Sequence, residues 1–239
     1  MNQNLIILGT ASTLISTPLD LEDTDYWACQ PVITHRKSKD GPLIVEGHRI
    51  DAIFEMHNSD YWTTIIERIN NYVKKNPDVK IYMQDQNAQI KNCVKYPLSE
   101  VQSFINHPRM RNFLTSTIAY MVALAIMQGY KSIEMYGIHM SSEEEEYSLQ
   151  RECISTLLGF AWGKGIDFWL PEQSDIMRSD HLYGYEQDKG IILKAIKYRD
   201  CVSLGEKQLE KQLQELKERY WQQKGGVTVI NNFIKELRK

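Results

Sequence analysis

The sequence is poor in cysteine and carries almost no net charge. Its 239 residues include 4 cysteines with no C-x-x-C pair, which argues against a zinc knuckle or a dithiol redox motif. We therefore expect Cys29, Cys93, Cys153 and Cys201 to stay reduced. The formal net charge of -3, from 28 basic and 31 acidic residues, offers no general attraction to nucleic acid. We expect no DNA binding, although the loop 36–39 supplies a small basic patch.

Long apolar runs and a targeting signal are also missing. The N-terminal segment has no charged region, and only about four apolar residues precede Gly9, too few for a signal peptide or a membrane span. We expect a cytoplasmic protein with no membrane partner.

Short apolar runs alternate with helical patterns over most of the chain. The predicted strands are 5–8, 26–29, 50–57, 79–83, 130–137 and 163–171, and the predicted helices are 59–75, 114–128 and 143–162. Strands that alternate with helices predict an α/β fold, a Rossmann-like, mostly parallel sheet with helices on both faces. We assign residues 1–190 to this nucleotide-binding domain.

The remaining residues, 191–239, have the pattern of a helical tail. Apolar or bulky residues recur there at heptad spacing, at Leu209, Leu213, Leu216, Tyr220, Val227, Ile230, Ile234 and Leu237. Gly225 and Gly226 interrupt this stripe, so it forms either one long helix or a hairpin of two. A coiled-coil-like or hairpin tail predicts a homodimer or a higher oligomer.

Two segments have the character of anion sites. The turn Gly9-Thr10-Ala11-Ser12-Thr13 follows the first strand, and Thr115-Ser116-Thr117 begins an apolar helix. Glycine permits close approach of a ligand, and hydroxyls with free amides at a helix start bind phosphate. The G-x-G-x-x-G and P-loop patterns are both absent, so the alternatives are an ordinary turn and plain helix capping.

Ionisable residues follow two of the predicted strands. Glu55 and His57 end one strand, and Gly137 and His139 follow another. Strand carboxyl ends line the ligand crevice of an open α/β sheet, so the three ionisable groups are candidates for acid–base chemistry there. The alternative is that each histidine is an ordinary, partly buried side chain.

Further candidates lie later in the chain. Arg151 has the chemistry to pair with a phosphate or carboxylate, and Tyr183 and Tyr185 to stack on a base. The acidic run 143–146 is either a solvent-exposed helix start or a site that attracts a divalent cation. The predicted catalytic residues are Glu55, His57 and His139; the predicted ligand-binding residues are Gly9, Thr10, Ser12, Thr115, Ser116, Thr117, Gly137, Arg151, Tyr183 and Tyr185.

Several of these motifs together resemble an uncharacterised family of Rossmann-like proteins carried by tailed bacteriophages. The resemblance rests on Leu8-Gly9-Thr10-Ala11-Ser12, Phe54-Glu55-Met56-His57, Tyr96-Pro97, residues 113–120, Tyr136-Gly137-Ile138-His139-Met140, residues 146–151 and Tyr183-Gly184-Tyr185-Glu186. More distantly, the Thr-Ser-Thr helix and the Tyr-Gly-x-x-Met strand are similar to archaeal 6-hydroxymethylpterin pyrophosphokinase-like domains and small bacterial sialyltransferases. In that pattern the position of His139 is usually an aspartate.

The resemblance implies a fold that binds a nucleotide or nucleotide-sugar and transfers a glycosyl or diphosphate group. We therefore expect a phage-encoded, glycosyltransferase-like enzyme acting in the host cytoplasm on a nucleotide-activated donor, with Mg²⁺ or Mn²⁺ as candidate cofactors. The alternatives are a non-catalytic protein that sequesters a nucleotide or assists virion assembly, and a Mg²⁺-dependent pyrophosphoryl or nucleotidyl transferase.

Overall fold

The fold is taken from a computed structural model. It describes residues 2–34, 48–57, 65–141, 145–179 and 181–184, with short stretches between 198 and 236. The chain divides into two compact units, Met1–Arg178 and Ser179–Lys239. The predicted domain boundary near residue 190 stays a prediction. Several features predicted above lie outside the described residues: the basic loop 36–39, the helix start 59–64, the first half of the acidic run (143–144), Tyr185, and Cys201, Leu209, Ile230 and Leu237.

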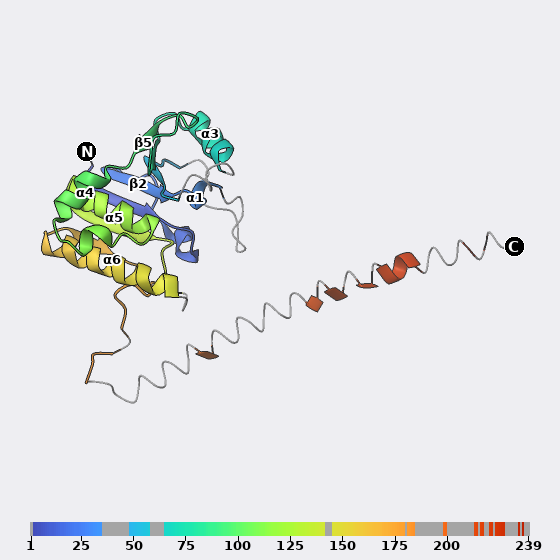
Figure 1. The fold of residues 1–239 in the computed structure, drawn as a ribbon. Helices are drawn as coiled ribbons and strands as arrows, with labels where there is room; N and C mark the ends of the chain where they lie inside the picture. Colours follow the sequence, from blue (N-terminus) through green and yellow to red (C-terminus); the bar gives the residue numbers. More distant parts are fainter. Residues whose placement is uncertain are drawn as a thin grey trace. The chain divides into compact units, whose positions relative to one another are not determined.

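The first unit is built on a parallel sheet, as the alternating pattern predicts. Its strands are β1 (Asn4–Leu8), β2 (Thr24–Cys29), β3 (Ala52–Glu55), β4 (Lys80–Met83), β5 (Cys93–Lys95), β6 (Ser132–Tyr136) and β7 (Asp167–Trp169). Their order across the 7-stranded sheet is β5-β4-β3-β2-β1-β6-β7, and every neighbouring pair is parallel. The sheet is a doubly wound, Rossmann-like α/β arrangement (Figure 1).

The strands are apolar on both faces because helices cover both faces. In β1, Leu5 and Ile7 belong to one core cluster, and Ile6 and Leu8 belong to the other. All four are at most 1% exposed. This continuous apolar run is what a central parallel strand needs, since neither of its faces meets water.

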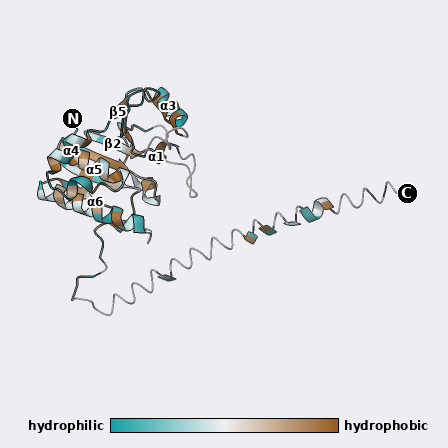
Figure 2. Cartoon of the chain, viewed as in Figure 1, coloured by the Kyte–Doolittle hydropathy of each residue, from teal (hydrophilic) through white to brown (hydrophobic). Residues whose placement is uncertain are grey.

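One face is covered by α4 (Leu98–Ile105), α5 (Thr117–Gln128) and α6 (Glu145–Gly163). The central helix α5 is apolar nearly all round, shown in brown in Figure 2, because it packs on the sheet and on its neighbouring helices. Ser116 caps its N-terminus, and Gly129 ends it at a φ of 80°.

The other face is covered by η1 (Ser12–Ser16), α1 (Pro31–Thr34) and α3 (Ile66–Lys75). The helix α3 is amphipathic: Ile69 and Val73 are buried, while Glu67, Lys74 and Lys75 are exposed. The sequence predicted this helix, but it did not predict α1, α4, β5 or the short η segments.

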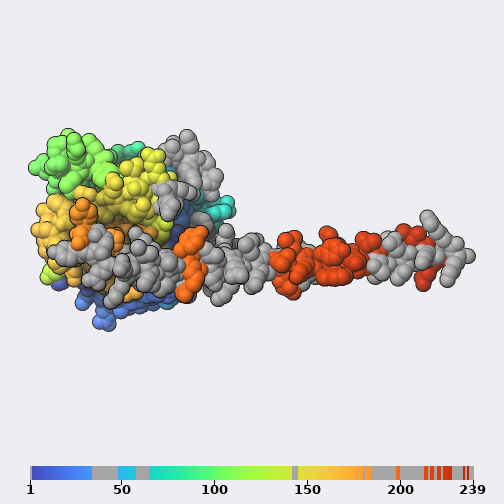
Figure 3. Space-filling view, turned by 90° about the horizontal axis from the view of Figure 1, so that it is seen from below, coloured from blue at the N-terminus to red at the C-terminus, as the bar shows by residue number. Residues whose placement is uncertain are grey.

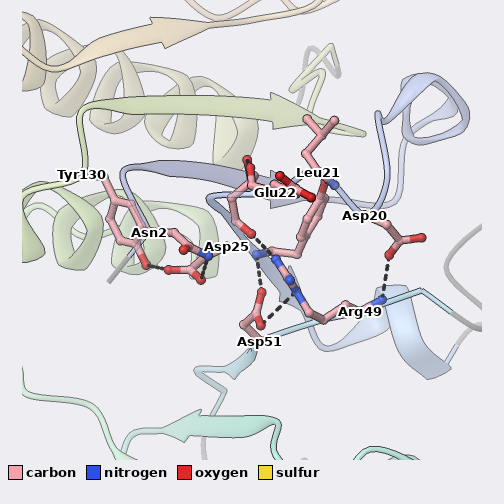
Figure 4. A network of polar contacts seen from close by, with 10 residues as sticks. Asn2, Asp20, Leu21, Glu22, Asp25, Arg49, Asp51 and Tyr130 are labelled. Carbon is pink, nitrogen blue, oxygen red and sulfur yellow. Dashed lines mark hydrogen bonds and ion pairs between the residues drawn. The ribbon is translucent and has the colours of Figure 1, made fainter.

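Side chains at the amino ends of the strands form a polar network (Figure 4). Asp25 accepts hydrogen bonds from Asn2 at 2.9 Å and from the Tyr130 hydroxyl at 2.6 Å. Asp51 accepts from the backbone N–H of Tyr26 at 2.8 Å and pairs with Arg49 at 3.2 Å. These contacts join the start of β2 to the segments that precede β1, β3 and β6, so they fix the edge opposite to the strand carboxyl ends.

The second unit contains helical segments at residues 213–214, 216–217, 220–221 and 223–227. Gly225 and Gly226 both lie within helix, which excludes a hairpin turn at that pair. Leu213, Leu216, Tyr220 and Val227 are more than half exposed. The predicted helical tail is therefore present in the described residues.

Candidate functional site

The direction of strand succession reverses between β1 and β6. From β1 the chain proceeds through β2, β3 and β4 to β5, and it then returns to β6 on the other side of β1. The connection that leaves β1 packs on one face of the sheet, and α6, which leaves β6, packs on the other. Such a switch point opens a crevice at the strand carboxyl ends, where ligands bind in open α/β sheets.

Gly9 and Gly137 lie at this switch point, directly after β1 and β6. Leu8 pairs with Tyr136 in the sheet register, so the two glycines that follow lie level with each other. A β-carbon on either glycine would overlap the carbonyl oxygen of the other, and Gly137 has a φ of 69°. The Ala11 N–H donates to the Gly137 carbonyl oxygen at 2.8 Å, which closes the two turns on each other. Glycine is required here first of all by this packing.

Thr13 connects the first turn to His139. Its hydroxyl oxygen accepts the Gly137 N–H at 3.0 Å and lies 2.8 Å from Nε2 of His139. Thr13 is only 8% exposed. Burial holds the pKa of His139 below its ordinary value, while the nearby Asp175 carboxylate acts in the opposite direction. A neutral imidazole fixed at one nitrogen therefore stands at the end of β6.

The N-terminus of α5 lies at the same edge of the sheet. This helix leads through a short turn into the start of β6, so it runs antiparallel to the strands and begins at their carboxyl ends. The Ser116 hydroxyl accepts the Ala119 N–H at 3.2 Å. Thr115 donates its hydroxyl to the Leu149 carbonyl at 3.3 Å, which fastens α5 to α6. The first amides of α5 add a positive helix end at the same edge of the sheet as the exposed Thr10 and Ser12.

Glu55 and His57 form a second ionisable pair at the end of β3. The Glu55 side chain is fully buried. Its Oε1 accepts the backbone N–H of His57 at 2.8 Å and contacts Nδ1 of the same ring. Its Oε2 is buried and has no hydrogen-bond partner among the residues that the structure describes. Glu55 thus fixes the His57 ring, while more than half of the His57 side chain is exposed.

His57 follows β3 and His139 follows β6, so the two histidines lie apart along the carboxyl edge of the sheet. Since β2 and β1 stand between β3 and β6, three strand spacings of ~4.8 Å separate the two strand ends, roughly 14 Å in all. The sequence placed Glu55, His57 and His139 at one edge of the sheet, and the structure does the same. One ligand would have to extend along the crevice to meet both groups.

Arg151 and Asp175 hold the far side of the turn after β6. Arg151, on α6, donates to the Met140 carbonyl oxygen, and the Asp175 N–H donates to the His139 carbonyl oxygen at 2.8 Å. Beside these contacts lies a shallow cavity of about 490 Å³. Its lining comes from α6, from the segment after β7 and from Phe113.

The predicted site residues Tyr183 and Tyr185 do not belong to the first unit. Tyr183 is 97% exposed and belongs to the second unit.

Burial raises the pKa of the Cys29 thiol, next to Glu55, to about 12, so this cysteine stays protonated at neutral pH and is no nucleophile. Among the described residues, no group of three or more His, Cys, Asp or Glu side chains is placed to hold a metal ion. Within the same residues, no helix is long and apolar enough to cross a membrane.

The predicted site residues did not include Thr13, Gln30 or Asp175, although Thr13 belongs to the turn 9–13 that was predicted as an anion site. Gln30 is 1% exposed and follows β2 directly, so it is a buried polar residue at the carboxyl edge. Its position directly after an apolar run and before a proline could have identified it from the sequence. Asp175 carries no such signal, because only the fold brings it to His139.

No model of a known protein family matches the sequence. No curated protein matches it either. Among solved structures, the chain is similar to an α-2,3-sialyltransferase from Campylobacter jejuni in its apo form, at 18% identity over 72% of this chain and 77% of that one, with a TM-score of 0.48. It is also similar to the sialyltransferase CstII from Campylobacter jejuni in complex with cytidine-5'-monophosphate, at 13% identity over 81% and 99% of the two chains, with a TM-score of 0.47.

Proposed function

We propose that the protein is a glycosyltransferase-like enzyme that binds a nucleotide-sugar in the crevice between β1 and β6. The observation that carries the proposal is the switch point itself, where the turns at Gly9 and Gly137 pack on each other and hold the partly buried Thr13–His139 pair, at the same sheet edge as the N-terminus of α5. The donor phosphates lie against Thr10, Ser12 and the first amides of α5. The close packing of the two turns is enough to explain why glycine stands at Gly9 and Gly137. It does not explain why a neutral His139 is held at the same point.

His139 is the general base of the proposed reaction. We assign to His139 the tautomer in which Nε2–H donates to the Thr13 oxygen, which also accepts the Gly137 N–H, so that Nδ1 carries the lone pair. An acceptor hydroxyl attacks the anomeric carbon of the donor, its proton passes to Nδ1, and the bond from the anomeric carbon to phosphate breaks as the nucleotide leaves. A pKa below the ordinary value keeps the ring unprotonated at neutral pH.

The Glu55–His57 pair is the second candidate for the base, because a buried carboxylate fixes the ring. Two isosteric variants distinguish the candidates. If His139 is the base, His139→Gln lowers turnover by about 10²-fold or more while His57→Gln has a smaller effect. The reverse order assigns the base to His57 and Glu55.

The test uses the full chain with CMP-, UDP- and GDP-linked sugars, each with and without EDTA. Thermal melting reports binding, since a ligand at about 100 times its Kd stabilises the protein by roughly 2.7 kcal/mol. Nucleotide release, followed by chromatography, reports turnover. We expect one donor class to raise the melting temperature and to be consumed. A panel in which no donor does either contradicts the proposal, and turnover that EDTA abolishes assigns a metal to the reaction.

We also propose that the tail joins two or more copies of the chain. Its exposed Leu213, Leu216, Tyr220 and Val227 follow heptad spacing, and such a stripe is buried when helices pair. Sedimentation of the wild type should give a dimer or larger species, and Leu216→Glu should dissociate it. A monomeric wild type contradicts this assignment.

We further propose that the protein is encoded by a bacteriophage and acts in the host cytoplasm.

A further inference from the structure

The shallow cavity beside the His139 turn is lined by equal numbers of positively and negatively charged side chains. Ser148, Arg151, Glu152, Ser155 and Thr156 come from successive turns of α6. The opposite wall carries Asp175, Met177 and Arg178 from the segment after β7, and Phe113 completes the lining. We call this set the α6 groove. Figure 3 shows the surface of α6 and of the segment that ends at Arg178 in yellow to orange.

The groove contains two guanidinium groups, on Arg151 and Arg178, and two carboxylates, on Glu152 and Asp175, so its formal charge is zero. Arg178 and Asp175 lie 3.6 Å apart and partly neutralise each other. A ligand with a strong net charge gains nothing from such a balance. A neutral ligand rich in hydroxyls, by contrast, both donates to the carboxylates and accepts from the guanidinium groups.

Three further properties agree with a sugar. The hydroxyls of Ser148, Ser155 and Thr156 add short polar partners along one helix stripe. The ring of Phe113 adds an apolar surface, on which the C–H face of a sugar can pack. The volume of about 490 Å³ lies within the range of ~300–1,000 Å³ for small-molecule sites.

The groove also adjoins the turn that carries His139. Its Asp175 donates its backbone N–H to the His139 carbonyl oxygen, and its Arg151 donates to the next carbonyl, that of Met140. A ligand in the groove therefore lies against residues that are fixed directly to the base of the proposed reaction.

We infer that the α6 groove is the binding site for an uncharged saccharide, which serves as the glycosyl acceptor. The assignment of this saccharide as the acceptor rests on the proposed function. The binding of a neutral saccharide to the groove can be measured independently of that function.

The probes are lactose, maltose and chitobiose as neutral disaccharides, and lactobionate as a carboxylate-bearing analogue of lactose. Each is added to the isotope-labelled full chain at tens of millimolar, with and without the nucleotide that stabilises the protein most. We expect at least one neutral disaccharide to shift the backbone amide signals of residues 148–156 and 175–178, and lactobionate to shift them less.

Two variants each place a tyrosine side chain in a different surface groove. Ser155→Tyr fills the α6 groove, while Asn71→Tyr, the control, fills the groove between α3 and Gln89. Saccharide affinity should fall at least roughly tenfold in Ser155→Tyr, which is about 1.4 kcal/mol, and stay unchanged in Asn71→Tyr. Both variants should keep the nucleotide-induced rise in melting temperature.

The outcomes separate this inference from the proposed function. If nucleotides bind but no neutral disaccharide shifts the groove amides, or lactobionate shifts them more, the saccharide assignment is wrong and the donor site stands. If a disaccharide binds in the groove and no nucleotide binds, the groove assignment stands as a saccharide site and the transferase proposal fails.

Discussion

The Thr13 hydroxyl oxygen lies 2.8 Å from Nε2 of His139 and accepts the buried N–H of Gly137 at 3.0 Å. One side chain on the turn after β1 therefore fixes both the turn and the imidazole that follow β6. Thr13→Val keeps the shape but leaves the Gly137 N–H unpaired, so we expect a loss of about 1–3 kcal/mol in the free energy of unfolding. Thr13→Ser keeps the hydroxyl and should lose less. Urea unfolding measures both, and equal losses would show that the hydroxyl does not matter.

The depressed pKa of His139 predicts how stability depends on pH. Because burial keeps this pKa below 6.5, the unfolded chain takes up a proton that the folded chain does not, as the pH falls through 6.5. Stability from this group is complete above pH 6.5 and declines below it until the folded pKa is reached. His139→Gln removes this contribution. The wild type should therefore lose stability relative to His139→Gln between about pH 7.5 and pH 5.5 in urea unfolding. A difference that is constant across this range contradicts the assignment.

Three glycine-to-alanine variants separate packing from backbone strain. In Gly137→Ala the new methyl overlaps Gly9 and φ is 69°, whereas in Gly165→Ala φ is 78° but nothing lies within 4 Å. Gly159→Ala, within α6, meets nothing and has no unusual φ, so it should be neutral or stabilise by about 0.5–1 kcal/mol. We expect Gly165→Ala to cost about 1–2 kcal/mol and Gly137→Ala to cost clearly more. Equal melting temperatures for Gly137→Ala and Gly165→Ala would mean that the turns are free to separate.

The polar network at the amino edge should contribute stability without contributing to function. Tyr130→Phe keeps the edge contact with Trp27 at 5.5 Å but removes the 2.6 Å hydrogen bond to Asp25. A hydrogen bond to a charged group is worth about 1.5–3 kcal/mol, which is the loss we expect in the free energy of unfolding. Because the network lies at the opposite edge of the sheet from the crevice, nucleotide affinity measured by titration should not change. A change in affinity with unchanged stability would reverse this assignment.

The sequence allowed the sheet and its main helices to be predicted because their signal is local. The run Leu5–Leu8 is apolar at every position, and α3 repeats Ile66, Ile69 and Val73 at helical spacing. The short strand β5 was not predicted, since its residues Val94 and Lys95 are exposed and it lies at the sheet edge. The helix α4 was not predicted either: it spans only eight residues, too few for a clear period.

The candidate site was predictable only in part. The rule that strand carboxyl ends line the crevice brought Gly9, Glu55 and His139 to one edge of the sheet. The strand order was not written in the sequence, so the roughly 14 Å between the ends of β3 and β6 could not be foreseen. The contact between Thr13 and His139 spans 126 positions of the chain, and only the register of β1 with β6 creates it.

The most direct test of the central claim is a map of amide chemical shifts in the isotope-labelled full chain during titration with CMP, UDP and GDP. If the crevice is the donor site, the shifts of the best-binding nucleotide will cluster on residues 9–13, on 116–119 and on 137–139. Shifts that fall instead on the amino-edge network around Asp25 and Asp51, or on the groove beside α3, would contradict it.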